Sequence, residues 1–239
     1  MNWLLIDCET EVTPTNFPLS IAYVQMQEWE PLGEPVQIFL NWETEISAEA
    51  TAIHGLTSDY LRQNGRDAKD ALQHFRGVVG ELSVGSYNFS FDGDKCLNPE
   101  FAAVGLKEIS RALCLLNAAR RLFDPNPAEN HKLQTLRAHF KAPERKAHGA
   151  LDDVLTVLDL LPHFQTRAAA LGVNAWAEFV TFANAEWYPP IITFGKFKGQ
   201  SVQSLRGNAR FNSYCQWLEA NADAEDFRRM ARYYKTMTQ

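Results

Sequence analysis

Residues 3–10 of the chain read Trp3-Leu4-Leu5-Ile6-Asp7-Cys8-Glu9-Thr10. The apolar run predicts a short buried strand, and the two acids mark its end. Side chains two residues apart on a strand project from the same face, so Asp7 and Glu9 are expected to reach one shared cation. The same pattern is common on solvated strand ends, and the pair alone therefore does not define a metal site.

The rest of the chain alternates between strand-like and helix-like segments. Apolar runs predict further strands over 20–26, 35–40 and 82–87, and a short one near Ile109. Helical spacing predicts helices over 68–79, 92–104, 113–123 and 132–140, with short helical turns over 47–61. A long helix is expected from Ala150 onward, and Pro162 is expected to kink or end it. Strands first, followed by alternation with helices, are typical of an α/β layer fold.

The composition is that of an ordinary globular protein. Of the 239 residues, 46% are apolar and 12% aromatic, and no segment has the apolar length that a bilayer span needs. The first apolar run lacks the basic flank and cleavage site of a secretory signal, so we expect a cytoplasmic protein without a membrane partner. The four cysteines lack zinc-site spacing and are expected to be reduced, mostly buried thiols: Cys8, Cys96, Cys114 and Cys215.

The charge is unevenly distributed along the chain. The net charge is -6, yet the segment from Ile191 onward holds eight Lys or Arg against four acids and is net +4, so residues 1–190 carry -10. An acidic chain is not expected to coat nucleic acid nonspecifically. The periodicity breaks around Tyr188, Pro189 and Pro190. We therefore expect a main domain over 1–172, a linker region over 173–190 and a small C-terminal domain over 191–239.

Three more residues are candidates for the active site. Asp92 follows the strand predicted over 82–87, although at this junction it could equally cap the next helix. His148 precedes the long helix, and Asp153 lies about one turn inside it. The spacing of five residues also occurs in His54 and Asp59, but only His148 leads into a helix whose apolar face fixes the acid on a core.

Together, four carboxylates indicate a metal site more strongly than any one of them alone: Asp7, Glu9, Asp92 and Asp153. Mg²⁺ prefers oxygen ligands, and two such ions need several carboxylates on rigid elements. Such a pair suits the hydrolysis of a phosphodiester by in-line displacement. A histidine near the metal ligands suits proton abstraction from the attacking water at neutral pH, and we assign this role to His148.

These residues belong to elements that resemble the DEDDh 3′-to-5′ exonuclease superfamily (DnaQ-like), which includes polymerase proofreading subunits. The elements are Asp7-Cys8-Glu9-Thr10, Ala52-Ile53-His54-Gly55-Leu56-Thr57, Asn88-x-x-Phe91-Asp92 and His148-x-Ala150-x-x-Asp153. Their joint order and spacing are highly specific, whereas each element alone is not. Within the superfamily the chain most resembles the bacterial exodeoxyribonuclease X family, because the likeness continues through 118–123 and 193–199 and covers nearly the whole chain.

The resemblance implies a ribonuclease-H-like fold, with a mixed five-stranded sheet flanked by helices and a small C-terminal accessory domain. It implies release of nucleoside monophosphates from DNA 3′ ends, in repair or end trimming, with two Mg²⁺ or Mn²⁺ ions per active site. By the same resemblance the four acids are metal ligands and His148 is the general base. The residues expected to contact the substrate are Thr10, His54, Asn88 and Phe91. A simpler interpretation of these four is turn formation, a hydrogen-bonded loop histidine and core packing.

The C-terminal segment Phe194-Gly195-Lys196-Phe197-Lys198-Gly199 alternates aromatic and basic residues. Such a pattern lets rings stack on bases while amines meet phosphates, although a hairpin with both Phe side chains in a core is the favoured interpretation. Tyr214, Trp217, Leu218 and Tyr233 are expected to form the helical core of this domain. The domain as a whole is a candidate DNA-holding arm, and a contact with a protein partner is equally open.

The motifs leave two alternatives to a DNA exonuclease acting on a single-stranded or frayed 3′ end. An RNA 3′-to-5′ exonuclease similar to oligoribonuclease or ribonuclease T would share these motifs. Discrimination of RNA from DNA rests on contacts to the 2′-hydroxyl, and no residue in the sequence indicates such a contact. A noncatalytic nucleic-acid or partner-binding module would normally show a broken acidic set, and this set is complete. Gly149 stands where the family often has a larger residue, and it is expected to loosen the placement of His148.

Overall fold

The computed structural model describes residues 1–12, 16–123, 128, 130–222 and 225–238. It divides the chain into two compact units, Met1–Asn184 and Ala185–Gln239. Among the described residues, no helix combines the length and the apolar character that crossing a membrane requires.

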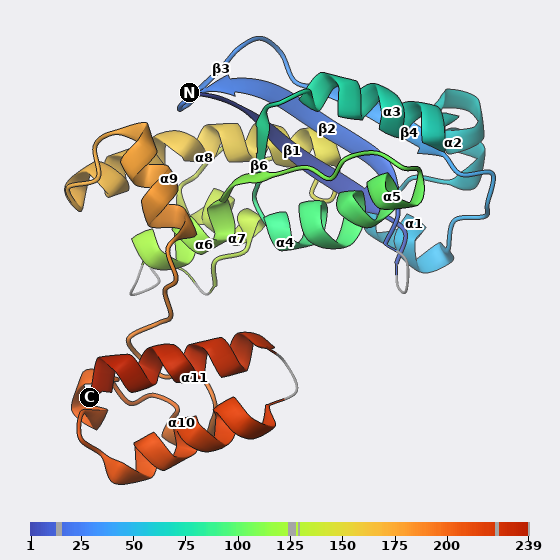
Figure 1. The fold of residues 1–239 in the computed structure, drawn as a ribbon. Helices are drawn as coiled ribbons and strands as arrows, with labels where there is room; N and C mark the ends of the chain where they lie inside the picture. The colour runs from blue at the N-terminus through green and yellow to red at the C-terminus, as the bar shows by residue number, and fades with distance from the viewer. Residues whose placement is uncertain (13–15, 124–127, 129, 223–224, 239) are drawn as a thin grey trace. The chain divides into compact units, whose positions relative to one another are not determined.

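A mixed sheet in the order β5-β4-β2-β1-β6-β7 is the centre of the first unit (Figure 1). Its five longer strands are β1 (Asn2–Thr10), β2 (Pro18–Gln27), β4 (Val36–Asn41), β6 (Ser83–Ser86) and β7 (Arg111–Cys114). β2 is antiparallel to both β1 and β4, whereas β6 is parallel to both β1 and β7. The predicted mixed five-stranded sheet is confirmed, and two strands of two residues extend it, β3 (Glu30–Pro31) on β2 and β5 (Arg66–Asp67) on β4.

Strand β1 has apolar side chains on both faces because helices cover both sides of the sheet. Trp3 and Leu5 enter one apolar cluster, and Leu4, Ile6 and Cys8 enter the other. The alternation of a strand therefore places Asp7 on the face of Trp3 and Leu5. This register decides which helices the acids of β1 meet.

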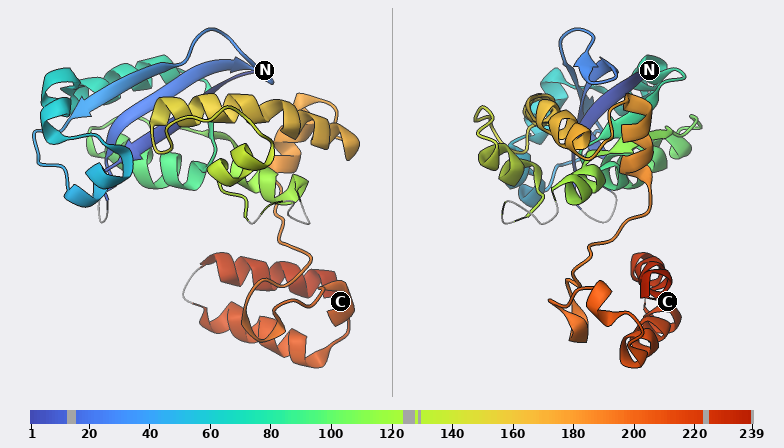
Figure 2. Two further views of the ribbon diagram at one scale, coloured as in Figure 1. Left: turned by 180° about the vertical axis from the view of Figure 1, so that it is seen from behind. Right: turned by 90° about the vertical axis from the view of Figure 1, so that its left-hand side faces the viewer.

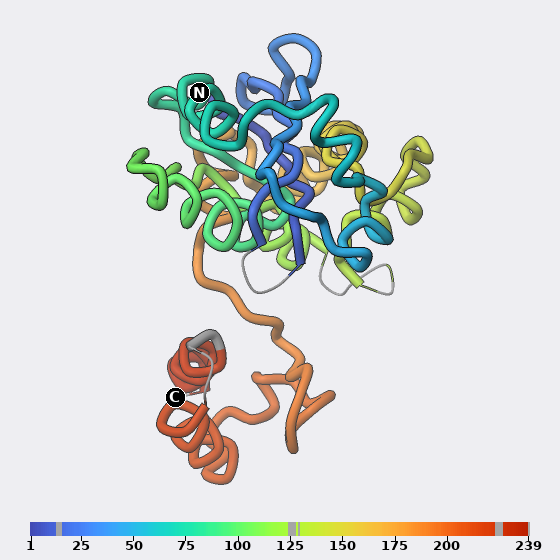
Figure 3. Tube along the Cα trace, turned by 90° about the vertical axis from the view of Figure 1, so that its right-hand side faces the viewer, coloured from blue at the N-terminus to red at the C-terminus, as the bar shows by residue number. Residues whose placement is uncertain are grey.

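The two faces carry different sets of helices, and α8 and α3 lie on opposite sides of the strands (Figure 3). The face of Trp3 is covered by α6 (Leu115–Leu122), α7 (Leu133–His139), α8 (Ala150–Ala170) and α9 (Trp176–Asn184). The other face is covered by α3 (Ala68–Val79), α4 (Phe89–Phe91), the π-helix η1 (Asp92–Leu97) and α5 (Asn98–Ala103). Two short helices, α1 (Ala48–His54) and α2 (Ser58–Asn64), lie between β4 and β5 in the chain.

Two helices differ in detail from what the sequence predicts. Pro162 does not end α8, which runs through it to Ala170. Leu160, Leu161 and Phe164 are buried around the proline, so packing on the core outweighs the lost backbone hydrogen bond. The helix predicted over 92–104 begins instead as the π-helix η1 and continues as α5.

The linker predicted over 173–190 is wrong in its first part, because 176–184 forms helix α9 in the first unit. The ring of Trp176 stacks on Trp3 with centroids 5.4 Å apart, and Phe179 contacts Trp29 at 4.4 Å. These aromatic contacts bury the helix against the sheet. The large rings of this segment carry enough apolar area to dock it.

The second unit is a helical hairpin, α10 (Ala209–Asn221) and α11 (Glu225–Thr238), preceded by two 3-10 turns, η2 (Gly195–Phe197) and η3 (Gln203–Leu205) (Figure 2). A single antiparallel bridge, Ile191 to Ser201, brackets η2, so the segment is a turn and not the favoured hairpin. Phe197 is buried as expected, but Trp217 is 57% exposed and does not belong to the core.

The four cysteines are buried and unpaired, as predicted. Cys8, Cys96 and Cys114 lie in the core beside β1, and Cys215 lies in the core of the second unit.

The close approach of Trp3 to Gly85 on β6 generates a stability prediction. A Cβ at Gly85 would lie 2.7 Å from the Trp3 ring, whereas a Cβ at Gly77 on α3 would meet nothing within 4 Å. We expect Gly85→Ala to lower the free energy of unfolding by about 1–3 kcal/mol through overpacking. Gly77→Ala is the control and should be neutral or stabilising by up to ~1 kcal/mol, because alanine favours helix. Urea unfolding checks both, and equal stability of the two variants would contradict the packing argument.

Candidate active site

The end of β1 brings two acids to the face that α8 covers. Glu9 is buried and Asp7 is half-buried, and ligand oxygens of Asp7, Glu9 and Asp153 all lie within 4.8 Å of one another. The ladder with β2 shifts register between Glu9 and Thr10, so regular pairing ends where the acids end. Residues separated by more than 140 positions in the chain thus share one cluster, as the sequence predicted.

Asp92 begins η1 directly beside this cluster. Its side chain is 3% exposed and accepts a hydrogen bond from the backbone N–H of Cys8, with Oδ1 3.2 Å from the nitrogen. It therefore does not serve as the helix cap considered from the sequence. This hydrogen bond connects η1 to β1 at Cys8, the residue between Asp7 and Glu9. Asp92 is not one of the three residues whose ligand oxygens lie within 4.8 Å of one another.

Asp153 projects from the first turn of α8 and is oriented by α7. Nε2 of Gln134 donates to Oδ1 of Asp153 at 2.8 Å, and Nε of Arg137 donates to Oε1 of Gln134 at 2.9 Å. The arginine fixes the orientation of the amide, so that its NH₂ group faces the acid. Neither residue was identified from the sequence, because spacing along α7 does not indicate which side chain meets α8.

His148 is exposed at the start of α8 and has a left-handed backbone, with φ 58°. A positive φ is uncommon outside glycine and persists only where the surroundings hold it. The adjoining Gly149 is the N-cap residue in ordinary extended conformation. The expected loosening at Gly149 has no support in its backbone, which other residues adopt equally well. His148 lies close enough to Asp153 to lower the pKa of that acid, within a balance that burial dominates.

The cluster is electrostatically strained. Burial, followed by repulsion from Asp92 and Asp153, raises the pKa of Asp7 well above its usual value. Burial and the same two neighbours raise the pKa of Glu9 to about 8, although the charge of Lys146 acts in the opposite direction. Burial raises the pKa of Asp92 to about 7. Carboxylates held together against their mutual repulsion are stabilised in the charged form by a cation.

The donor set fits a hard divalent metal. All four acids offer oxygen ligands, and neither a thiolate nor an imidazole is among the three groups that converge. Mg²⁺ and Mn²⁺ favour such oxygen donors, whereas softer ions favour sulfur or nitrogen. The raised pKa values indicate that binding of a cation would release protons.

The four residues predicted to contact substrate lie in different settings. Thr10 is half-buried beside Glu9 at the end of β1. His54 ends α1, is 3% exposed and accepts the Leu56 N–H at Nδ1, while its Nε2 has no hydrogen-bond partner. Asn88 accepts a hydrogen bond from Ser90 and forms the turn into α4, and Phe91 is half-buried just before Asp92.

Lys146 was missed by the sequence reasoning. Its Nζ lies 3.3 Å from the backbone oxygen of His54, and its charge acts on Glu9. It is the cation that connects the α1 turn to the acidic cluster. Its position two residues before His148 was the available signal.

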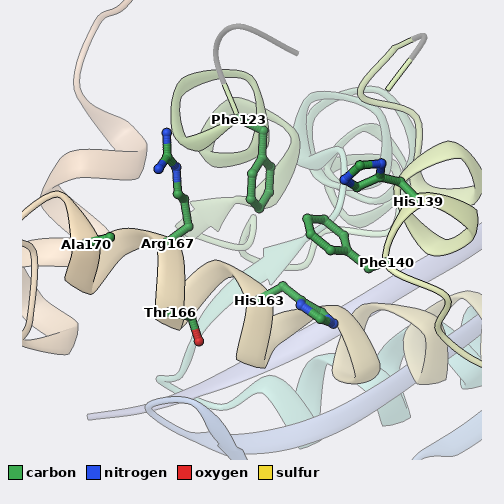
Figure 4. A pocket seen from close by; sticks show the side chains of 7 residues that line it. All are labelled: Phe123, His139, Phe140, His163, Thr166, Arg167 and Ala170. Carbon is green, nitrogen blue, oxygen red and sulfur yellow. The ribbon is translucent and has the colours of Figure 1, made fainter. Parts of the chain in front are cut away.

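A separate pocket of about 430 Å³ lies at the other end of α7 and α8. His163 is ten residues along α8 from Asp153, or about 15 Å of helix rise. The rings of Phe140 and His163 stack there with centroids 4.3 Å apart (Figure 4). The lining residues are Phe123, His139, Phe140, His163, Thr166, Arg167 and Ala170. None of them belongs to the acidic cluster.

Comparisons with known proteins agree with this geometry. The family described as RNase_T, exonuclease, matches residues 4–161, more than half of the chain. The chain is 26% identical over 149 residues to DNA polymerase III subunit epsilon of Rickettsia felis, covering 59% of this chain and 63% of that protein.

Solved structures of exonuclease I share the fold. The structure of E. coli exonuclease I in complex with a dT13 oligonucleotide matches with a TM-score of 0.61 and 19% identity, covering 72% of this chain and 42% of that one. Exonuclease I from Methylocaldum szegediense matches with a TM-score of 0.57 and 18% identity, covering 76% and 42%. The chain thus spans less than two thirds of the length of these relatives.

The chain belongs to the RNase_T exonuclease family, within the DEDDh-type superfamily. The superfamily and the ribonuclease-H-like fold predicted from the sequence are confirmed. The nearer likeness to the exodeoxyribonuclease X family stays a prediction.

The raised pKa of Asp92 generates a prediction about pH. Between the unfolded value near 3.9 and about 7, the native carboxyl holds a proton that the unfolded chain has lost. The native state then binds more protons, so stability falls as pH rises through this window. Asp92→Asn removes this titration and retains an acceptor for Cys8. In EDTA the variant should gain on the order of 1–3 kcal/mol over the wild type between about pH 4 and 7.

Thermal melts across this pH range measure the difference, with Asp94→Asn as the control. Asp94 is exposed on the same π-helix. Its variant should follow the wild-type curve. Parallel curves for Asp92→Asn and the wild type would show that Asp92 does not carry the buried charge.

Proposed function

We propose that this protein is a metal-dependent 3′-to-5′ exonuclease that releases nucleoside monophosphates from DNA 3′ ends. The observation that carries the proposal is the convergence of Asp7, Glu9 and Asp153, with ligand oxygens within 4.8 Å, in a chain of an exonuclease family. A role in DNA repair or end trimming and a cytoplasmic location accompany this proposal as predictions from the sequence.

Asp7, Glu9, Asp92 and Asp153 would hold Mg²⁺ or Mn²⁺, with two ions per active site. Such ions supply an activated water and neutralise charge on the scissile phosphate. The chain's own part is to fix the four carboxylates on rigid elements. The hydrogen bond of Gln134 to Asp153 and that of the Cys8 N–H to Asp92 provide this rigidity.

His148 is proposed as the general base. It is exposed at the edge of the acidic cluster, where it can approach solvent and substrate. Its left-handed backbone directs the side chain independently of the helix that follows. In this role one of its ring nitrogens takes the proton of the attacking water.

The terminal nucleotide is proposed to bind beside the β1 and α1 ends. His54 Nε2 is a buried polar atom without a partner, so a substrate acceptor would satisfy it. Thr10, Asn88 and Phe91 lie in the adjoining segments and are proposed to line the path of the strand. The dT13 oligonucleotide bound by the E. coli relative supports single-stranded DNA as the substrate class.

Cleavage assays test the reaction and choose the substrate. We expect a 5′-labelled DNA oligonucleotide to shorten from its 3′ end with Mg²⁺ and not with EDTA. Asp153→Asn should reduce the rate by about 10³-fold, the several kcal/mol that a bound metal contributes to a transition state. Asp152→Asn, its neighbour outside the convergent cluster, is the control and should stay near wild type.

The assay is repeated with an RNA oligonucleotide of the same sequence. Shortening of RNA alone would retain the mechanism and overturn the substrate. If folded protein binds the oligonucleotides but shortens neither, the proposed enzymatic function is wrong and the protein is a nucleic-acid-binding module.

The role of His148 has its own test. His148→Ala should lower kcat by roughly 10²–10⁴-fold, the usual contribution of general base catalysis. Metal affinity should stay close to that of the wild type, because His148 is not a proposed ligand. His74→Ala, which removes an exposed histidine on α3, is the control. Single-turnover rates and metal titration separate the two effects, and a loss of metal affinity matching the loss of rate would reassign His148 as a ligand.

A further inference from the structure

One face of α10 presents an exposed tryptophan beside a half-buried tyrosine. Arg210, Tyr214, Trp217 and Asn221 are spaced by four, three and four residues, so they share one stripe of the helix. The rings of Tyr214 and Trp217 are nearly parallel, with centroids 6.4 Å apart and an interplanar angle of 10°. An adjoining face supplies the core through Phe211, Cys215 and Leu218, and this packing leaves Trp217 57% exposed.

A lysine from the preceding turn lies against this ring pair. Nζ of Lys196 is 4.9 Å from the ring centroid of Tyr214 and 5.4 Å from that of Phe197. The turn approaches the helix closely, because a Cβ at Gly195 would lie 2.1 Å from the Tyr214 hydroxyl and the φ there is +66°. Glycine therefore allows the backbone to place the cation beside the rings.

The charge around the ring pair is positive. The unit from Ala185 holds eight Lys or Arg against five acids. The acid on α10, Glu219, lies half a turn away from Arg210 around the helix and pairs with Lys235 at 2.8 Å. The other acids that follow α10 are Asp223, Glu225 and Asp226, whose side chains lie outside those that the structure describes.

We propose that the stripe Arg210, Tyr214, Trp217, together with Lys196, binds a single-stranded nucleic acid away from the 3′ end that is cleaved. An exposed indole beside a parallel tyrosine ring and nearby cations suits a strand whose bases stack while its phosphates meet the amines. The proposal rests on the proposed function for its substrate. It deepens that function by giving the C-terminal unit the task of holding the strand.

The surroundings favour a nucleic acid over a protein partner. Protein interfaces usually have a contiguous apolar centre. On α10 the other exposed residues are Ala209, Ser213, Gln216, Ala220 and Asn221, so small and polar groups surround Trp217 on that helix. A positively charged unit that exposes a tryptophan among polar groups matches a polyanion that offers flat bases.

The test uses the full chain in EDTA, so that binding is measured without cleavage. Fluorescence anisotropy with a fluorescein-labelled oligothymidylate of about 20 nucleotides gives the Kd. Trp217→Ala should weaken binding by about 5- to 100-fold, the effect of losing one base stack, and Trp217→Phe should restore most of it. Met237→Ala is the matched control, since Met237 is 56% exposed in the same unit.

A second readout separates this proposal from the proposed function. With Mg²⁺, Trp217→Ala should raise KM for the long oligothymidylate and leave cleavage of a trinucleotide unchanged. Wild-type protein that cleaves neither substrate but still loses DNA affinity on Trp217→Ala would overturn the proposed function and support the binding stripe.

Two results would overturn the binding stripe itself. One is Trp217→Ala binding DNA as tightly as the wild type, including the case in which it loses a protein partner instead. The other is an equal loss of affinity in Trp217→Ala and Met237→Ala, because that would reflect the folding of the unit and not the ring pair.

Discussion

The burial of mutually repelling carboxylates at the end of β1 is the constraint on which the rest of the first unit depends. Apolar packing on both faces of β1 holds the strand at the centre of the sheet, and that packing supplies the free energy that confines Asp7 and Glu9. The strain is visible in the raised pKa of Glu9, to about 8. A cation bound at such a cluster would relieve the repulsion between its carboxylates. The packing of the fold therefore sets the electrostatic state of the cluster.

Hydrogen bonds from uncharged groups hold two acids of the cluster in fixed orientations. The Cys8 N–H holds Asp92, and the amide of Gln134 holds Asp153 in an orientation set by Arg137. Each of these donors fixes one oxygen of its acid. This arrangement gives each acid a defined direction before any ligand arrives, which is the property that metal-assisted hydrolysis requires.

The sequence predicted the parts of the site that depend on local periodicity. Strand alternation placed Asp7 and Glu9 on one face, and the apolar face of α8 placed Asp153. It did not predict Gln134, because the contact between α7 and α8 depends on how two helices pack. It also did not decide whether Pro162 ends α8, and it placed Trp217 in the core, because helix continuation and exposure depend on the packing of neighbours such as Phe164 and Leu218. Roles for Thr10, His54, Asn88 and Phe91 rest on the family likeness.

The distribution of tryptophan gives each unit its own optical signature. In the first unit Trp176 contacts both Trp3 and Trp29, with Trp29 and Trp176 centroids 4.9 Å apart. Indole emission shifts to longer wavelength in water and to shorter wavelength in an apolar setting. The aromatic cluster that docks α9 is therefore a blue-shifted reporter of the first unit, whereas Trp217 emits from solvent. Selective quenching by iodide or acrylamide would consequently reduce the emission of Trp217 first and leave that of the buried cluster in the first unit.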